Sequence, residues 1–473
     1  MSAYFNMMRV RELGIVFLAL FVIGILSVDA SNVRVLLFLS FFLLILVCSF
    51  IIKERIVIIL IIYLALMGLI RRALIPVAGW SSFDPLLILG PSITVVMALS
   101  LFWENKKSSL IVSPKPDNLM ITLFVIGCIQ MVNPLSGGLT SGLIASMYII
   151  IPWLWYFLSF YKFKQENIGT IFNVIEVIGT AIAGYGLYQT FYGILPFEQQ
   201  WVDITGYAAL YLAEDTVRAI GTFPSAQEFV FFTMITFMVG FSKLVTTKRY
   251  ITHLPVVLIT LLSIFFASSR TIIFFIALGI LVVLVLSKKT ILAKLITGIV
   301  AIAAFYFIWS SLTHLNPAWF GKAEPAVSHM IEGLIDPLAE DQTGIGHIER
   351  FIDGLYSIFT NPIGHGIASI TKAADKSASA EAMSTEIDIS NMIVAMGIGG
   401  IVYSLVILTT LYKTIYLALL NRSTETLCTI GIFIGGFGTW INGGFYTAPI
   451  VIWLLVGWVH QDYYRIRGER KCI

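Results

Sequence analysis

The sequence predicts an all-α fold, a polytopic helical bundle embedded in a membrane. Apolar residues make up 58% of the 473 residues and charged residues only 12%, about half of the roughly 25% that is typical of soluble domains. The mean hydropathy is +0.91. The apolar residues form long continuous runs, which favours helices in lipid over the alternating strands of an outer-membrane barrel. We expect one integral membrane domain over 1–473.

Individual apolar runs predict about 12–14 transmembrane helices, since a span needs about 20 apolar residues. The candidate spans, in order, are 13–30, 34–52, 56–75, 85–103, 118–133, 142–161, 168–193, 225–244, 254–268, 271–287, 291–312, 390–412, 426–441 and 447–461.

The basic residues predict the orientation. With the N-terminus in the cytoplasm, 21 of the 30 Lys and Arg residues fall on the cytoplasmic side, as the positive-inside rule requires. Both termini then lie in the cytoplasm. The other nine face outward and are Arg34, Arg71, Arg72, Arg218, Arg270, Arg350, Lys322, Lys372 and Lys376.

Two long connections, 194–224 and 313–389, face outward in this topology. Long loops between spans are often functional. Within the second loop, 344–360 places its apolar residues on one helical face and then meets Asn361-Pro362. We expect an amphipathic helix on the outer rim of the bundle, inside a large extracytoplasmic loop.

Three of the outer arginines occur in distinctive local patterns. Arg218 lies in EDTVRAIGTFPSAQEF (214–229), where Gly221 and Pro224 predict a loop that re-enters the membrane and Ser225 predicts a helix N-cap. Arg270 lies at the tight hairpin FFASSRTIIFF. Arg350 precedes NPIGHG (361–366). Three guanidinium groups at one face would suit a pyrophosphate. The alternative for every outer arginine is that its side chain snorkels to the interface or forms an ion pair.

The series of motifs resembles the O-antigen ligase and polymerase superfamily. The residues that carry the resemblance are R-x-x-G-T-F-P at 218–224, S-S-R at 268–270, H-I-E-R-F-x-D-G-L at 347–355, N-P-I-G-H-G at 361–366 and E-I-D-I-S-N-M-I-V-A-M-G-I-G-G at 386–400. The resemblance implies a GT-C-like membrane glycosyltransferase, without metal or cofactor, at the outer face of the bacterial cytoplasmic membrane. Its donor would be an undecaprenyl-pyrophosphate-linked oligosaccharide. Arg218 and Arg270 would face the donor pyrophosphate, and Arg350 would be a third contact or a brace.

The general base is left open by the motifs. Ligases of this group typically carry a His-Asn pair at the start of the span that ends in G-x-x-G, and no His stands there in this sequence. This departure favours a polymerase. Glu386 and Asp388 are candidates for the base, and His365 and His347 are others. Glu386 is also suited to a helix N-terminus, and His365 to an ordinary loop.

These observations predict a polysaccharide polymerase that joins lipid-linked repeat units and inverts the anomeric centre. The same-class alternative is an O-antigen ligase or a protein O-oligosaccharyltransferase. A transporter or flippase of the lipid-linked glycan is the alternative of another class, and Glu176, deep in a span, favours it. A chain-length regulator is a possible partner, and the net charge of +3 is too small to indicate nucleic acid.

Aromatic residues near the outer loops would suit sugar stacking or an interfacial belt. They are Trp201, Tyr207, Tyr211, Trp319 and Tyr446.

Overall fold

The structure, a computed structural model, describes residues 32–52, 55–107, 115–207, 210–213, 216–335, 344–371, 383–385, 387–441 and 446–471. It is almost entirely helical, which confirms the all-α prediction. The predicted span 13–30 and the candidate base Glu386 lie outside the described residues.

The first half of the chain forms α2 (Val33–Ile52), α3 (Ile56–Ala73), α4 (Ile75–Ala78), α5 (Leu86–Lys107), α6 (Asn118–Met131), η3 (Pro134–Ser136), α7 (Leu139–Ser146), α8 (Ile150–Lys162), α9 (Gln165–Tyr192), α10 (Pro196–Thr205), β1 (Tyr211–Ala213) and β2 (Thr216–Val217). The two strands pair antiparallel. The second half forms α11 (Ala226–Thr247), α12 (Tyr250–Phe266), α13 (Arg270–Ser287), α14 (Ile291–Thr313), η5 (Pro317–Ala323), α15 (Glu324–Ile335), α16 (Gly344–Thr360), η6 (Ile367–Ile370), α17 (Asp388–Met396), α18 (Gly399–Leu420), α19 (Thr424–Gly435) and α20 (Thr447–Lys471).

Within the described residues, six helices are long and apolar enough to cross a membrane, or seven if the bent pair α7–α8 is one span. The six are α3, α9, α11, α13, α14 and α18. Helical membrane character is therefore supported, while the count of 12–14 spans stays a prediction. Each predicted span from 34–52 onward falls on a helix or a broken pair of helices, because the length of an apolar run is a local property of the sequence.

Two of the predicted spans are broken. The chain bends by 43° between α7 and α8. The predicted span 390–412 is divided between α17 and α18 at Gly397, whose φ of +55° favours glycine. There the amide of Ile398 donates to the carbonyl oxygen of Pro362 at 2.9 Å. The break is thus the place where the loop 361–366 docks onto the bundle.

The predicted amphipathic helix is present as α16, with the predicted bounds. Its buried position is Gly354, which packs against Thr385 and Ser390. Ile352 and Phe359 of the apolar face are exposed. An exposed apolar face is what a helix at a lipid boundary requires.

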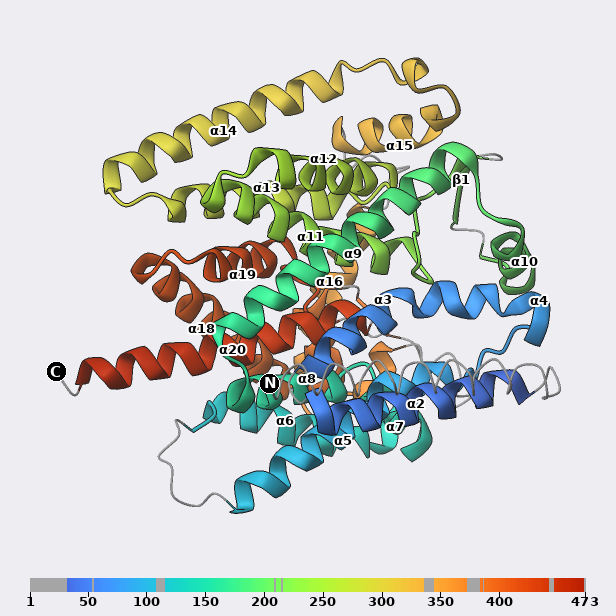
Figure 1. The fold of residues 1–473 in the computed structure, drawn as a ribbon, viewed down its shortest axis with the longest axis vertical. Coiled ribbons are helices and arrows are strands. Elements are labelled where there is room, and N and C mark those ends of the chain that lie inside the picture. The colour runs from blue at the N-terminus through green and yellow to red at the C-terminus, as the bar shows by residue number, and fades with distance from the viewer. Residues whose placement is uncertain are drawn as a thin grey trace, which may run out of the picture.

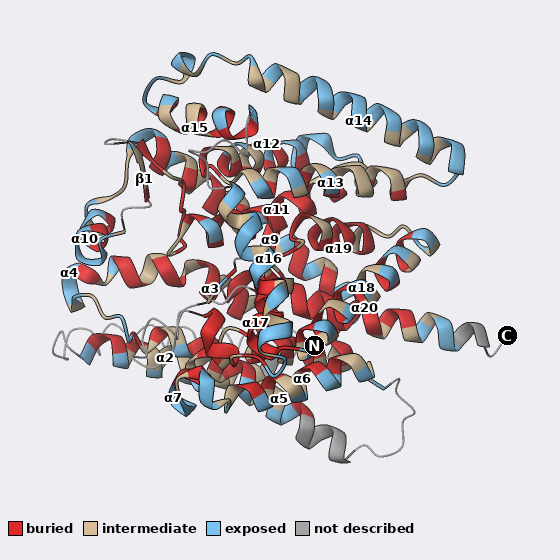
Figure 2. Cartoon of the chain, turned by 180° about the vertical axis from the view of Figure 1, so that it is seen from behind, coloured by how far each residue is buried: buried red, intermediate tan, exposed pale blue. Residues whose placement is uncertain are grey.

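The core is centred on α11, whose apolar window is 78% buried and which contacts α9, α12, α13, α19 and α20. In Figure 2, α11 is largely buried, whereas α14 is a mixture of exposed and intermediate residues along its length. None of the apolar window of α14 is buried, so lipid is the natural solvent for that helix.

The bundle has two distinct ends. Figure 1 shows the α13–α14 turn and the C-terminal end of α20 on the left, with β1, α10 and α4 on the right. We call the left end the basic end, since it carries Lys288 and Arg422, and Arg422 Nε donates to the carbonyl oxygen of Lys288 at 3.3 Å. We call the other end the α15 end. It gathers the start of α11, the α12–α13 turn and α15.

Candidate functional site

Arg218 begins a loop, 218–224, that is held rigidly at the α15 end. The guanidinium of Arg72 donates to the carbonyl oxygens of Gly221 and Phe223 at 2.8 and 2.5 Å. The side-chain oxygen of Gln189 accepts from the amide of Gly221 at 2.7 Å. Most of the loop is buried, as expected of the predicted re-entrant segment. The rigid loop fixes the backbone from which the Arg218 side chain extends.

The predicted N-cap of α11 is confirmed. Ser225 Oγ accepts from the amide of Glu228 at 3.2 Å, which satisfies a backbone donor that the first turn leaves unpaired. The cap fixes the direction in which the chain leaves the loop.

Arg72 has a structural role, because both terminal nitrogens of its guanidinium are paired within the protein. Its Nη2 lies 3.1 Å from Glu198 Oε1, and both side chains are buried. Glu198 also accepts from Tyr185 at 2.8 Å and from Gln189 at 3.0 Å. The pair therefore anchors α10 and the loop 218–224 to α3.

Arg34 and Arg71 share one buried carboxylate. Arg71 Nε lies 3.0 Å from Asp84 Oδ2, and Arg34 pairs with the same oxygen. Arg71 also lies over the Trp80 ring, 4.5 Å from its centroid. Ion pairing, the alternative to ligand binding, is thus the arrangement found for three of the outer arginines.

Arg270 is held against α15. It is the first residue of α13, after a tight turn in which Ser268 has φ +57°. Its guanidinium lies across Gly333, where a Cβ atom would come within 1.8 Å of Nη1. Arg270 Nη2 also donates to His329 Nε2 at 3.2 Å, one helical turn earlier on α15. A glycine at 333 is therefore needed for this close approach.

His329 is a site residue that the sequence motifs do not contain. Burial and the charges of Arg270 and Arg218 lower its pKa to about 4, so the ring is neutral near pH 7. Because guanidinium can only donate, Nε2 of His329 must accept and the ring proton must lie on Nδ1. In the described part of the chain this buried Nδ1 has no hydrogen-bond partner.

Arg218 supplies a second buried donor without an acceptor. Its Nε has no hydrogen-bond partner among the described residues. Burial lowers the pKa of Arg218, and the charge of Arg270 acts in the same direction while Tyr207 opposes it. A buried donor without a partner costs about 1–3 kcal/mol, and a multi-oxygen anion would satisfy both donors.

The third predicted arginine is placed elsewhere. Arg350 is exposed on α16, which packs against α17, and it is not among the charges that shift the pKa of His329. The structure therefore brings Arg218 and Arg270 together with His329 and does not add Arg350 to them.

Asp388, a candidate base, is almost fully buried. Its Oδ2 accepts from Tyr403 Oη and from the amide of Ile441, both at 2.9 Å. Burial raises the pKa of Asp388 to about 7. These bonds tie α17 to α18 and to the chain before α20, so the carboxylate serves as a structural tie.

His365, another candidate base, is half-buried in the loop 361–366. Gly364 and Gly366 have φ of +89° and +84°, as the predicted tight turn requires. The amide of His365 donates to the carbonyl oxygen of Val394 at 2.9 Å. The structure thus attaches His365 to α17 and does not place it beside His329.

Two of the aromatic residues proposed to stack on sugars are buried: Trp201 is 4% and Tyr446 6% exposed. The Arg72 guanidinium instead lies over the Trp201 ring, 5.3 Å from the centroid of that ring. Trp319 is 76% exposed.

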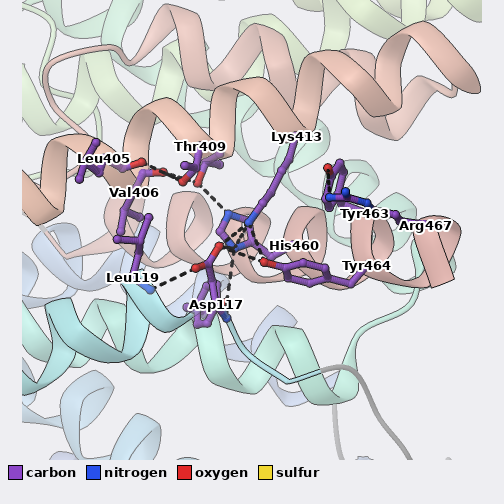
Figure 3. A network of polar contacts seen from close by, with 12 residues as sticks. Asp117, Leu119, Leu405, Val406, Thr409, Lys413, His460, Tyr463, Tyr464 and Arg467 are labelled. Atoms are coloured by element: carbon purple, nitrogen blue, oxygen red, sulfur yellow. Dashed lines mark hydrogen bonds and ion pairs between the residues drawn. The ribbon is translucent and has the colours of Figure 1, made fainter.

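Buried charges at the basic end are mutually paired. Glu176, the acid that favours a transporter, lies 2.6 Å from Lys243 and 2.5 Å from His253. Figure 3 shows a second cluster, in which Asp117 Oδ2 lies 2.5 Å from Lys413 Nζ and 3.7 Å from His460 Nδ1. These clusters join helices, which gives Glu176 a structural role.

No group of three or more His, Cys, Asp or Glu side chains within the described ranges is arranged to hold a metal ion. No protein-family model matches the sequence, and no curated protein matches it. The family resemblance therefore depends on the motifs, and the functional argument depends on the site.

Proposed function

We propose that the protein is a membrane glycosyltransferase, a polysaccharide polymerase that joins undecaprenyl-pyrophosphate-linked repeat units. One observation carries this proposal. Arg218 and Arg270 both lie near His329, and two buried N–H groups there, Arg218 Nε and His329 Nδ1, have no acceptor among the described residues. An anion with several oxygens fits these groups, and an apolar bundle selects an anion attached to lipid.

The reaction needs charge stabilisation more than covalent catalysis. An acceptor sugar hydroxyl attacks the anomeric carbon of the donor glycan while the bond from that carbon to the pyrophosphate oxygen breaks. The hydroxyl proton passes to a general base, and lipid pyrophosphate leaves with the bond electrons. Arg218 and Arg270 neutralise the charge that grows on this leaving group, and the Nδ1 proton of His329 adds a hydrogen bond.

The two ends of the bundle support a proposed location. If the basic end lies in the cytoplasm, the α15 end faces outward and receives a glycan already moved across the membrane. The proposal therefore includes the bacterial cytoplasmic membrane as the location, with both termini inside. The GT-C-like architecture and Glu386 as a general base belong to the same proposal.

The test supplies the purified protein in lipid with one substrate, the undecaprenyl-pyrophosphate repeat unit. A polymerase uses it as donor and as acceptor, so we expect a ladder of glycan lengths and free undecaprenyl pyrophosphate. A single product that needs another acceptor would identify a ligase. Movement between leaflets without any change in length would identify a flippase.

A further inference from the structure

A cleft of about 610 Å³ lies beside the arginine site, at the α15 end. Its lining includes Tyr192, Gly193, Gly321, Lys322, Glu324 and Ser328. These residues come from the C-terminal end of α9, from η5 and from the first turns of α15, which Figure 1 shows at one side of the molecule. Binding sites for small molecules have about 300–1,000 Å³, so the cleft can admit a ligand.

We propose that this cleft binds the acceptor saccharide, the uncharged glycan whose hydroxyl attacks the donor. This inference rests on the proposed glycosyl transfer and adds a second subsite to it. The first argument is position. Ser328, in the cleft, directly precedes His329 in α15. Thr216 Oγ1 donates to the carbonyl oxygen of Lys322 at 2.9 Å, which ties the cleft wall to the strand that leads into Arg218.

The second argument is the aromatic surface. Tyr192 is 79% exposed at the end of α9. It stacks on Tyr188 with ring centroids 5.3 Å apart, and Tyr188 stacks on Tyr185 at 6.1 Å. The row restricts the Tyr192 ring, so little side-chain entropy remains to be lost on binding. An exposed, pre-oriented ring offers an apolar surface to the C–H face of a sugar.

The third argument is charge. Lys322 and Glu324 line the same cleft, so donors and acceptors stand together and the formal charges cancel. Sugar hydroxyls both donate and accept hydrogen bonds, and they match this lining better than a pyrophosphate does. The neighbouring Arg218 and Arg270 provide the opposite chemistry, so donor phosphate and acceptor sugar are separated by charge.

The fourth argument is access to the backbone. Gly193 and Gly321 line the cleft with φ of +86° and +53°, and a Cβ atom at either position would meet nothing within 4 Å. Both glycines therefore border open space, where a ligand can approach the chain closely.

The experiment measures saturation-transfer NMR between the full-length protein in lipid nanodiscs and three probes, the methyl glycosides of glucose, galactose and N-acetylglucosamine. We expect saturation transfer from the wild type with at least one probe, a loss of at least fivefold in Tyr192→Ala and retention in Tyr192→Phe. Glu324→Gln should also weaken the signal. Tyr250→Ala is the matched control, since Tyr250 is 60% exposed at the basic end of α12.

The outcomes separate the cleft from the proposed function. Glycoside binding that depends on Tyr192, in a protein that forms no ladder from the lipid-linked unit, would support the cleft and overturn the polymerase. A ladder of glycan lengths, together with equal glycoside binding in wild type and Tyr192→Ala, would support the polymerase and overturn the acceptor cleft. Absence of saturation transfer from all three probes, or displacement of the probe by inorganic pyrophosphate, would also overturn the acceptor cleft.

Discussion

At the scale of single residues, arginines of the same predicted orientation divide into a structural group and a group that we propose to bind the ligand, according to their neighbours. Arg34, Arg71 and Arg72 are paired with buried carboxylates. Arg218 and Arg270 lie beside a neutral histidine, and the carboxylate of Glu332 also acts on the charge of Arg270. Sequence separates these groups poorly, because the partners Asp84 and Glu198 are distant in the chain and no motif joins them to the arginines.

We predict that Arg218→Ala and Arg270→Ala each reduce polymer formation at least 100-fold, since loss of one donor to a developing negative charge costs about 10²–10³ in rate. Lys at either position should restore only part of the activity, because it lacks the planar fork that contacts two oxygens. The measurement is ladder formation from the single lipid-linked substrate at matched protein levels.

Arg249→Ala is the control for both variants, since Arg249 is exposed at the basic end. It should leave the ladder unchanged. Full polymer yield from both Ala variants would remove the shared pyrophosphate site.

His329 predicts a dependence of stability on pH. Its native pKa of about 4 lies below the ordinary 6.5, so the unfolded chain binds a proton first as the pH falls. The stability that neutral His329 contributes is fully present above about pH 6.5 and is lost on descending to about pH 4. We expect the midpoint of thermal unfolding to fall over this range, and to fall less in His329→Gln. Parallel curves for both proteins would contradict the assignment.

The same variants test whether His329 positions Arg270. Gln can accept from Arg270 and donate to phosphate, whereas Ala does neither. We therefore expect His329→Gln to keep much more activity than His329→Ala. In the wild type, titration of the His329 ring should change the activity little between pH 5.5 and 7.5.

At the scale of elements, the contact between α13 and α15 is the joint on which the site depends. Gly333→Ala would place a methyl group where the Arg270 guanidinium lies. Since that guanidinium ends a flexible side chain, we expect it to move away from His329 and polymer formation to fall at least tenfold. The midpoint temperature of unfolding of Gly333→Ala should stay the same or rise, because Ala is favoured over Gly in a helix by about 1 kcal/mol.

Gly184→Ala in α9 is the matched control for that substitution, because a Cβ atom there meets nothing within 4 Å. It should keep full activity with equal or higher stability. Equal activity of both glycine variants would show that the Arg270–His329 contact does not matter for the reaction.

Element positions were largely predictable, whereas the contacts between them were not. Helices α11, α13 and α14 begin and end within a few residues of the predicted runs, since apolar length and capping are local properties. The break at Gly397 depends on packing against Pro362, a residue 35 positions earlier in the sequence.

His329 was missed for a similar reason, because its importance comes from Arg270. The signal in the sequence that could have indicated it was His329 followed by Gly333, one turn later on an amphipathic helix.

At the scale of the whole molecule, the clusters of ionisable side chains at the two ends differ in their partners. In the basic-end cluster of Figure 3, Asp117, Lys413 and His460 bind one another across α6, α18 and α20. At the α15 end, two buried donors in the arginine site lack acceptors among the described residues. Breaking a buried pair costs about 3–5 kcal/mol, so the first arrangement holds helices together. The second is suited to receiving a ligand from outside.

This asymmetry makes the orientation a test of the whole proposal, because a lipid-linked glycan on the outer face can reach only an outward site. We predict that the α15 end faces outward. In a background with all four native cysteines replaced by alanine, Ala318→Cys in η5 should react with a membrane-impermeant maleimide in intact cells. Arg249→Cys, at the basic end, should react only after the membrane is permeabilised. Both positions are exposed. The reverse labelling pattern would put Arg218 and Arg270 in the cytoplasm, where no translocated glycan is present, and the polymerase would then have to be abandoned even if both arginines bind phosphate.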